Sequence, residues 1–563
     1  MNTEILGVVA MFLVTIALAW PLGGYIARIY GGERSWTDPI FGPIERLFFR
    51  ISGIDSSREM TWVEHLKAML TINVVWFLLT MFILLNMAWL PLNPDGNPSM
   101  TPDLAFNTTI SFLVNCNLQH YSGESGLSYL GQLCLMFLQF VSAATGLASA
   151  AVLFNALKNR QTNQLGNFYD YFLKSNTRIL LPLCIVVTGL LLVNGTPMTF
   201  EGKDTIVGLQ GDTVQVSRGP AAAFVAIKHI GTNGGGFYGA NSAHPLEDPN
   251  YLTAFLQMFA QFIIPAAMVF GLGFYLRRRR LALMIFGVMT AGFLMLVIPT
   301  MINEMGGNPA LGSMGVDQTL GSMEGKEMRF GAAMSGYWSI LTTVISTGSV
   351  NAMHDSTMPL SGMNQMIAMM VNCFYGGGGV GILNFYIFII VAVFISGLMV
   401  GRTPEFMGKK VEAREMKIAM IIALFHPFLI LVGTALSSWT VVGDPSLTWL
   451  NNPGFHGFSE MLYEYTSSSA NNGSGFEGLG DNNPFWNITT GFVLIFSRYL
   501  PIIGPLAIAG LLASKKYIPE SAGTLKTDTT TFGAMVFAVI LLIAALAFFP
   551  ALALGPIAEH FSR

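Results

Sequence analysis

Long apolar runs alternate with polar connections along the whole chain. A helix needs about 20 apolar residues to cross the ~30 Å hydrocarbon core of a bilayer. About ten runs reach that length, so the pattern predicts an all-α polytopic membrane protein with about ten transmembrane helices. The runs centre near Leu13, Phe77, Leu138, Ile185, Phe262, Phe293, Val391, Leu431, Leu494 and Leu541.

Four shorter helical stretches stand between these runs, and each leads into a tract rich in Gly, Asn, Thr or Ser. At about 11 to 15 residues the stretches are too short to cross the membrane, so we interpret them as re-entrant pore helices. They cover residues 102–113, 220–230, 331–345 and 458–469, and the tracts follow at 114–119, 231–236, 346–349 and 471–474.

The polar tracts recur at intervals of about 117, 115 and 125 residues, which indicates tandem copies in one orientation. We therefore expect four repeats of helix, pore loop and helix around a pseudo-fourfold pore, with one extra helix at each end. Any single tract could be an ordinary solvent loop, but repetition at matching positions favours a shared pore. The repeats are expected at residues 61–160, 161–279, 280–412 and 413–516, between a first helix with its cytoplasmic connection (1–60) and a last helix (517–563).

Composition agrees with a membrane as the main solvent. Hydrophobic residues make up 52% of the chain and charged residues 11%, whereas a soluble domain has about 25% charged residues. The net charge of -3 is too small to indicate a nucleic-acid partner. The four cysteines form no CxxC pair and no metal-ligand spacing, so we expect neither disulfides nor zinc.

Basic residues fall on alternate connections, as the positive-inside rule requires. The connections at 28–58, 158–178, 277–280, 402–417 and 515–526 carry Lys and Arg and are expected in the cytoplasm. Those around 93–103 and 442–456 contain neither and are expected outside. With an even number of helices, both termini are then predicted outside. The first run lacks a preceding basic residue and a nearby cleavage site, so we expect it to remain as a helix.

The pore loops offer backbone oxygens to a cation. A half-helix that enters from outside points its C-terminal carbonyls towards the bilayer centre, where their partial negative charge favours a cation. Gly234, Gly348 and Gly473 permit backbone conformations that turn successive carbonyls inward. No Asp or Glu lies inside a tract, whereas Ca²⁺ and Mg²⁺ usually recruit carboxylates. The pattern therefore favours a dehydrated monovalent cation, with K⁺ first among the candidates.

Two other features sit at membrane depth. Arg498 lies well inside the ninth run, where a charge is costly and usually functional; a structural ion pair or snorkelling to an interface is the alternative. Gly376, Gly378 and Gly381 spell GxGxxG, but apolar stretches flank them instead of a strand and a helix. We interpret them as a break in the second helix of repeat three, which could form a gate loop, and not as a nucleotide site.

Histidines and charged residues flank two of the tracts. Lys228 and His229 precede the second tract, while His354 and Asp355 follow the third. We interpret these residues as loop braces without ion contacts. An intramembrane hydrolase that uses His354 and Asp355 is a distant alternative, because no nucleophile and base accompany them.

Five segments carry a family resemblance: QHYSGES from Gln119, GTNGGGFYGANSAHP from Gly231, AMHDS from Ala352, GRTPE from Gly401 and SSSANNGSGFEGL from Ser467. They resemble the KdpA family, the potassium-binding subunits of the bacterial Kdp potassium-transporting ATPase, and the likeness covers nearly the whole chain. The resemblance implies a K⁺-channel-like arrangement of the four repeats, as in the superfamily of K⁺ transporters.

The resemblance also implies a selectivity filter made mainly of backbone carbonyls, with Gln119 beside it and the positive Arg498 below it. Relatives often carry Thr at the position of Cys116 and Trp at that of Leu118, so the packing behind the first loop could differ here. The implied filter residues are Asn115, Cys116, Thr232, Asn233, Gly234, Ser346, Thr347, Gly348, Asn471, Asn472 and Gly473.

The energy source for transport lies outside this chain. The sequence contains neither a GxxxxGK[ST] phosphate loop nor a DKTGT phosphorylation sequence. The resemblance implies a P-type ATPase subunit, KdpB, as the partner that hydrolyses ATP, together with KdpC and KdpF in the bacterial inner membrane. The chain would then bind extracellular K⁺, bind no nucleotide and pass the ion to KdpB. A stand-alone channel or symporter subunit of the Trk/Ktr type is the alternative.

Overall fold

Ten helices in the described part of the chain are long and apolar enough to cross a membrane, which confirms the predicted number. The computed structural model describes residues 3–519 and 526–562, so the ends of the predicted terminal segments at residues 1–2 and 563, and residues 520–525, lie outside it. The ten are α1 (Thr3–Tyr30), α3 (Trp62–Asn86), α6 (Tyr129–Lys158), α7–α8 (Phe168–Val193), α10 (Tyr251–Leu276), α11 (Arg279–Met305, continued in the short α12), α15 (Val380–Val400), α16 (Ala413–Gly443), α18 (Pro484–Ser514) and α19 (Thr530–Leu552, continued to the C-terminal helix).

Four pore helices stand between the spans, one in each repeat. They are α4 (Pro102–Leu113), α9 (Ala221–Ile230), α13 (Gly331–Val344) and α17 (Phe455–Ala470). Pro102 begins α4 at a position where its missing N–H is not needed for the helix. The fourth pore helix starts three residues earlier than expected. Gly454, directly before it, has a non-helical φ of 93° and sets the start of the helix at Phe455.

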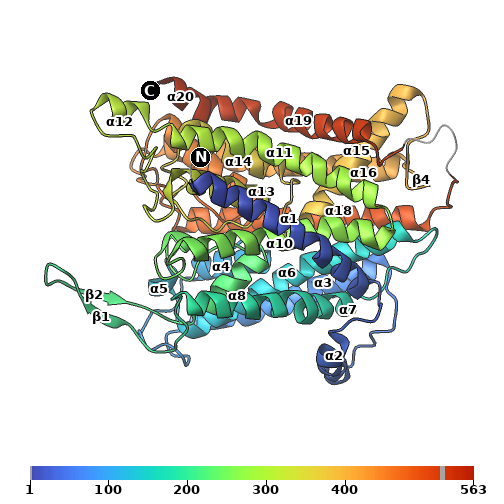
Figure 1. Ribbon diagram of the computed structural model, residues 1–563, viewed down its shortest axis with the longest axis horizontal. Helices are drawn as coiled ribbons and strands as arrows, with labels where there is room; N and C mark the ends of the chain where they lie inside the picture. The colour runs from blue at the N-terminus through green and yellow to red at the C-terminus, as the bar shows by residue number, and fades with distance from the viewer. Residues whose placement is uncertain (1–2, 520–525, 563) are drawn as a thin grey trace.

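The helices form one bundle with distinct ends. In Figure 1 the spans run side by side, with the β1–β2 hairpin, α5 and α12 at one end and α2 and β4 at the other. Both chain termini lie at the end that carries α12. The two extra helices cover the outside of the repeats: α1 packs along α10, and α19 packs against α11 and α15. Gly23 allows this approach, since a Cβ there would crowd the carbonyl of Ala267.

Repeat three differs from the other repeats in its second helix. Repeats one, two and four each continue from the pore loop into a single long helix, namely α6, α10 and α18. In repeat three, α14 (Pro359–Val371) ends at Asn372, which has a left-handed φ of 45°, and α15 starts only at Val380. The segment between them contains Gly376 and Gly378, and Gly381 is the second residue of α15, so the helix breaks at the start of the GxGxxG sequence.

Short elements complete the chain. They are α2 (Asp38–Ser52), α5 (Gly123–Gly126), the π-helical turn Ser175–Leu180 between α7 (Phe168–Lys174) and α8 (Leu181–Val193), the antiparallel pairs β1 (Asp204–Val207) with β2 (Thr213–Val216) and β3 (Glu405–Phe406) with β4 (Lys409–Lys410), the 3₁₀ turn Asn241–Ala243, α12 (Pro309–Ser313), the π-helical turn Ala553–Ile557 and α20 (Ala558–Ser562).

Candidate functional site: four pore loops at one axis

The four pore loops share one unusual backbone shape. We call them loop one (114–119), loop two (231–236), loop three (346–349) and loop four (471–474). Each loop contains two residues, separated by one position, that have left-handed φ values, and the residue between them does not; in loop two Gly235 (66°) is left-handed as well. This alternation turns successive carbonyls to the same side of the chain. The left-handed pairs are Asn115 (65°) and Asn117 (58°), Thr232 (52°) and Gly234 (81°), Ser346 (55°) and Gly348 (86°), and Asn471 (50°) and Gly473 (100°).

The amides of the loops point back towards the pore helices. The N–H of the middle residue in each loop donates to the pore-helix carbonyl five residues earlier. The four bonds are Cys116 to Ser111 (3.0 Å), Asn233 to Lys228 (2.8 Å), Thr347 to Thr342 (2.9 Å) and Asn472 to Ser467 (2.9 Å). In loops three and four the next amide donates to the side-chain hydroxyl of the same pore-helix residue, at 3.0 Å in both cases.

The carbonyls of the same middle residues remain available. Among the described residues no hydrogen bond reaches the backbone oxygens of Cys116, Asn233, Thr347 or Asn472, and all four residues are fully buried. A buried carbonyl without a partner costs free energy comparable to a lost hydrogen bond, so these oxygens need a partner from outside the chain. Four carbonyls at equivalent positions suit a cation that has shed its water.

Backbone contacts close the four loops into a ring. A Cβ on Gly234 would overlap the carbonyl of Thr347, one on Gly348 that of Asn472, and one on Gly473 that of Cys116. Loop two therefore touches loop three, loop three touches loop four, and loop four touches loop one. The structure thus brings all the expected filter residues together around one axis.

Side chains of loop one complete the ring by binding the backbone of loop two. Asn115 Nδ2 donates to the carbonyl of Thr232 at 2.9 Å, and Asn117 Nδ2 donates to that of Gly234 at 2.6 Å. Gln119 makes two bonds to Gly236, accepting from its N–H at 2.7 Å and donating to its carbonyl at 3.0 Å. Between loops one and two, side-chain amides of loop one therefore donate hydrogen bonds to backbone carbonyls of loop two.

A buried ion pair holds loop two from behind, and the sequence interpretation missed half of it. Lys228 pairs with Glu247, and both side chains are fully inaccessible to solvent. Glu247 also accepts the backbone N–H groups of Phe237 and Tyr238 with its other oxygen. Because the Lys228 carbonyl binds the loop-two amide, the pair links the two ends of the loop. His229 contacts Ser349 of loop three at 3.1 Å, so Lys228 and His229 both brace loops.

A second bracing group lies beyond loop one. His120 contacts Asn487 at 2.6 Å and Glu464 at 3.2 Å, with Asp481 at 3.9 Å. Burial alone would lower the pKa of His120, but Asp481 and Glu464 raise it to about 9. The imidazolium at neutral pH therefore ties loop one to the pore helix of repeat four. Across the ring, His354 contacts Tyr463 at 2.8 Å, and the N–H of Asp355 donates to Glu477 at 3.1 Å.

Arg498 lies on α18, next to the supports of the filter. Its Nη2 donates to the Ser142 carbonyl at 2.9 Å, and the residue is 4% exposed. The Ser142 hydroxyl in turn donates to Asn115 Oδ1 at 2.9 Å. Among the described residues, no Asp or Glu lies within ion-pair distance of Arg498.

The helix break of repeat three lies directly against the start of loop two and against the residue that precedes loop three. The N–H of Gly378 donates to the Thr232 hydroxyl at 2.7 Å, and the N–H of Gly377 donates to the carbonyl of Ile345. Gly376 and Gly381 meet backbone to backbone, because a Cβ on Gly381 would overlap Gly376.

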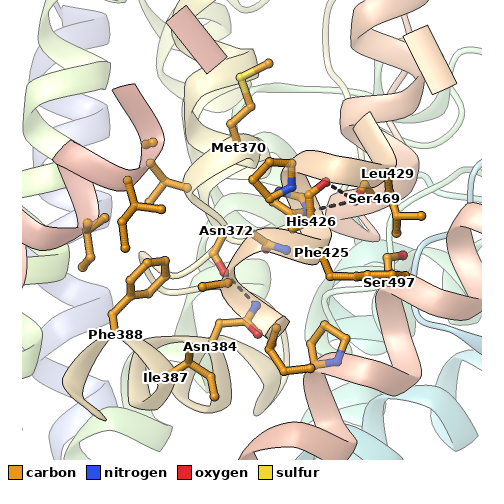
Figure 2. A pocket seen from close by; sticks show the side chains of 18 of the residues that line it. Met370, Asn372, Asn384, Ile387, Phe388, Phe425, His426, Leu429, Ser469 and Ser497 are labelled. Atoms are coloured by element: carbon orange, nitrogen blue, oxygen red, sulfur yellow. Dashed lines mark hydrogen bonds between the residues drawn. The ribbon is translucent and has the colours of Figure 1, made fainter. Parts of the chain in front are cut away.

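A cavity of about 50 Å³ opens beside the same segment, between α14, α15, α16, α17, α18 and α19. Figure 2 shows its polar side chains, Asn372, Asn384, His426, Ser469 and Ser497, among apolar ones. The Ser346 hydroxyl of loop three donates to Asn372 Oδ1 at 3.1 Å, which connects the cavity to the filter. The volume is enough for a few water molecules.

Comparison with known proteins places this geometry in context. The family model described as "Potassium-transporting ATPase A subunit" (KdpA) matches residues 9–561. Proteins named "Potassium-transporting ATPase potassium-binding subunit" from Flavobacterium johnsoniae and Bacteroides thetaiotaomicron are 70% and 60% identical to this chain, each over 100% of both chains. Among solved structures, the potassium transporter TrkH from Vibrio parahaemolyticus has a TM-score of 0.52 at 14% identity, covering 90% of this chain and 98% of that one. The last likeness concerns the fold alone.

Proposed function

Because this chain belongs to the family of the potassium-transporting ATPase A subunit, we propose that it selects extracellular K⁺ and delivers the ion to a partner P-type ATPase subunit. The observation that carries the proposal is the set of four buried, unpaired carbonyls at the middle positions of the pore loops. The names of the relatives, "potassium-binding subunit", support K⁺ as the ion.

Selection rests on exchanging water for peptide oxygens. The carbonyls of Cys116, Asn233, Thr347 and Asn472 replace part of the hydration shell of the ion. No carboxylate stands within the loops, so the site lacks the fixed charges that Ca²⁺ and Mg²⁺ usually recruit. The ring contacts at Gly234, Gly348 and Gly473 fix the spacing between the loops, which keeps the oxygens from closing around a smaller ion.

Arg498 and the segment around Gly376, Gly378 and Gly381 control the inner exit. A buried positive charge next to the filter supports repels a cation that moves straight down the axis. The segment covers Thr232 at the start of loop two and Ile345 just before loop three, and it acts as a gate loop. An ion that passes it enters the cavity of Figure 2, where Asn372, His426 and Ser469 provide polar atoms on the way to the partner.

ATP hydrolysis takes place in the partner, KdpB, in a complex with KdpC and KdpF in the bacterial inner membrane, and this chain binds no nucleotide. Both termini face outside, since they lie at the same end of the bundle as the connections without basic clusters. The division into repeats at 61–160, 161–279, 280–412 and 413–516 is part of the same proposal.

The same ring of four loops would also suit a stand-alone channel or symporter subunit, which would carry K⁺ without ATP. The purified complex separates the two. We expect vanadate-sensitive ATP hydrolysis that K⁺ stimulates, and no ATP-independent flux through vesicles containing the complex. If this chain alone carried K⁺ and the complex showed no K⁺-stimulated ATP hydrolysis, the chain would be a channel and not a pump subunit.

The Arg498→Gln substitution tests the inner barrier in the same vesicles. We expect K⁺ to leak without ATP, while Arg498→Lys retains most of the block because it keeps the charge. An equal leak in both variants would show that the Ser142 contact matters and the charge does not.

A further inference from the structure

The helix α2 exposes an apolar face. Ile40, Ile44, Leu47, Phe48 and Ile51 are between 49% and 79% exposed. Their spacing places all five on one face of the helix. A surface helix of a soluble protein would turn such a face towards the core.

The orientation of α2 is fixed by bonds on its charged edge. Glu45 is 6% exposed and accepts from Arg178 Nε and from the Thr177 hydroxyl, both at 2.7 Å. Asp38 at the start of the helix also pairs with Arg178. The charged edge therefore faces the protein, and the apolar face cannot roll inward without breaking a buried ion pair.

The surroundings of α2 identify what covers the apolar face. The helix α2 follows α1 and lies apart from the spans, at the same end of the bundle as β4 (Figure 1). Trp36, 73% exposed, stands just before it, and Trp is enriched where membrane meets water. Arg46 and Arg50 are exposed on the flank away from Glu45, and neither pairs with an acid among the described residues. Basic side chains at this depth attract anionic headgroups.

We propose that α2 lies in the bilayer interface, with Ile44 and its neighbours among the acyl chains and with Arg46 and Arg50 at the phosphates of anionic lipids. A partner protein would need its own apolar surface here, whereas the lipid around the spans supplies apolar acyl chains and charged headgroups together. The lipid occupant also explains why the basic residues flank the apolar face on one side only.

Spin labels test the proposal in the complete complex, reconstituted into nanodiscs of zwitterionic lipid with or without anionic phosphatidylglycerol. Labels at Ile44→Cys and at the matched control Arg46→Cys report the two sides of one helix turn. The four native cysteines are buried, and the unsubstituted chain measures their background. We expect the ratio of collisions with oxygen to collisions with a water-soluble nickel complex to be at least about tenfold higher at position 44.

Two results at position 44 would overturn the proposal. A label at position 44 that meets the nickel complex faces water, and one shielded from both probes is covered by protein; either result overturns the proposal. Ile40→Cys repeats the measurement if the first label disturbs assembly. With Arg46→Gln and Arg50→Gln together, a label at position 44 should lose its response to anionic lipid and retain its oxygen contact. A response that persists without the arginines would overturn the headgroup contact.

Discussion

Loop one reaches the backbone shape of the other three loops with asparagine where they have glycine. Asn117 has a φ of 58°, in the same left-handed region as Gly234, Gly348 and Gly473. Asparagine tolerates this region better than most residues with a Cβ. A left-handed φ at this position therefore does not require glycine, so backbone conformation alone does not explain Gly234, Gly348 and Gly473.

The contacts between loops supply that reason. Gly234, Gly348 and Gly473 each lie against a carbonyl of the next loop, which leaves no room for a Cβ. At the fourth contact the positions are exchanged: Asn117 keeps its Cβ, and Gly235 of loop two provides the space, since a Cβ there would crowd Asn117. The ring thus has one glycine for each contact between loops, which accounts for two of the three consecutive glycines in loop two, Gly234 and Gly235.

Placing a carboxylate at a crowded contact should have the largest effect. In Gly234→Asp the side chain would collide with the Thr347 carbonyl and bring a fixed charge to the ion path. We expect the K⁺ concentration for half-maximal ATP hydrolysis to rise at least about 100-fold, equal to about 2.7 kcal/mol. Gly189→Ala on α8, where a Cβ meets nothing within 4 Å, is the control. Unchanged K⁺ affinity and K⁺/Rb⁺ discrimination would refute the assignment.

Loop two depends on the buried pair of Lys228 and Glu247, so removing this pair should have the next largest effect. Glu247→Gln leaves the Lys228 charge buried without a counter-charge, and breaking such a pair costs about 3–5 kcal/mol. We expect a lower unfolding temperature and about tenfold weaker K⁺ binding. Asp212→Asn on the exposed hairpin serves as control. Combining Glu247→Gln with Lys228→Met should recover part of the stability; a further loss would contradict this account.

Substitutions at Asn117 test whether the left-handed φ matters separately from the space between the loops. Asn117→Gly keeps the left-handed φ and loses only the bond to Gly234, worth about 0.5–1.5 kcal/mol, so we expect a few-fold loss of K⁺ affinity. Asn117→Ala adds a strain of about 1–2 kcal/mol and should lose more. Titration of ATP hydrolysis with K⁺ compares them, and equal affinities for Gly and Ala would show that φ at this position does not matter.

Cys116→Thr should have the smallest effect. The side chain lies in an apolar cluster with Val114, Leu118 and Leu494, whereas the ion meets the backbone carbonyl. We expect K⁺ affinity to change by less than about threefold, that is, less than ~0.7 kcal/mol. A tenfold change would mean that the side chain, and not the carbonyl alone, shapes the filter at loop one.

The sequence predicts the parts of this site that repeat along the chain. The spans, the pore helices and the four tracts have a composition and a spacing that can be counted, and Asn117 could also have been found, since it lies 117 residues before Gly234. Contacts between repeats leave no such pattern. The partner of Lys228 is a glutamate in a connecting loop, and that of Arg498 is a carbonyl 356 residues away. Only the folded chain brings these groups together.

A density map of the assembled complex in K⁺, and again in Tl⁺ for its anomalous signal, tests the central claim most directly. We expect an ion on the axis, enclosed by the carbonyl oxygens of Cys116, Asn233, Thr347 and Asn472. Intact loops with no anomalous peak between these oxygens, or a peak bound only by side chains elsewhere, would contradict it.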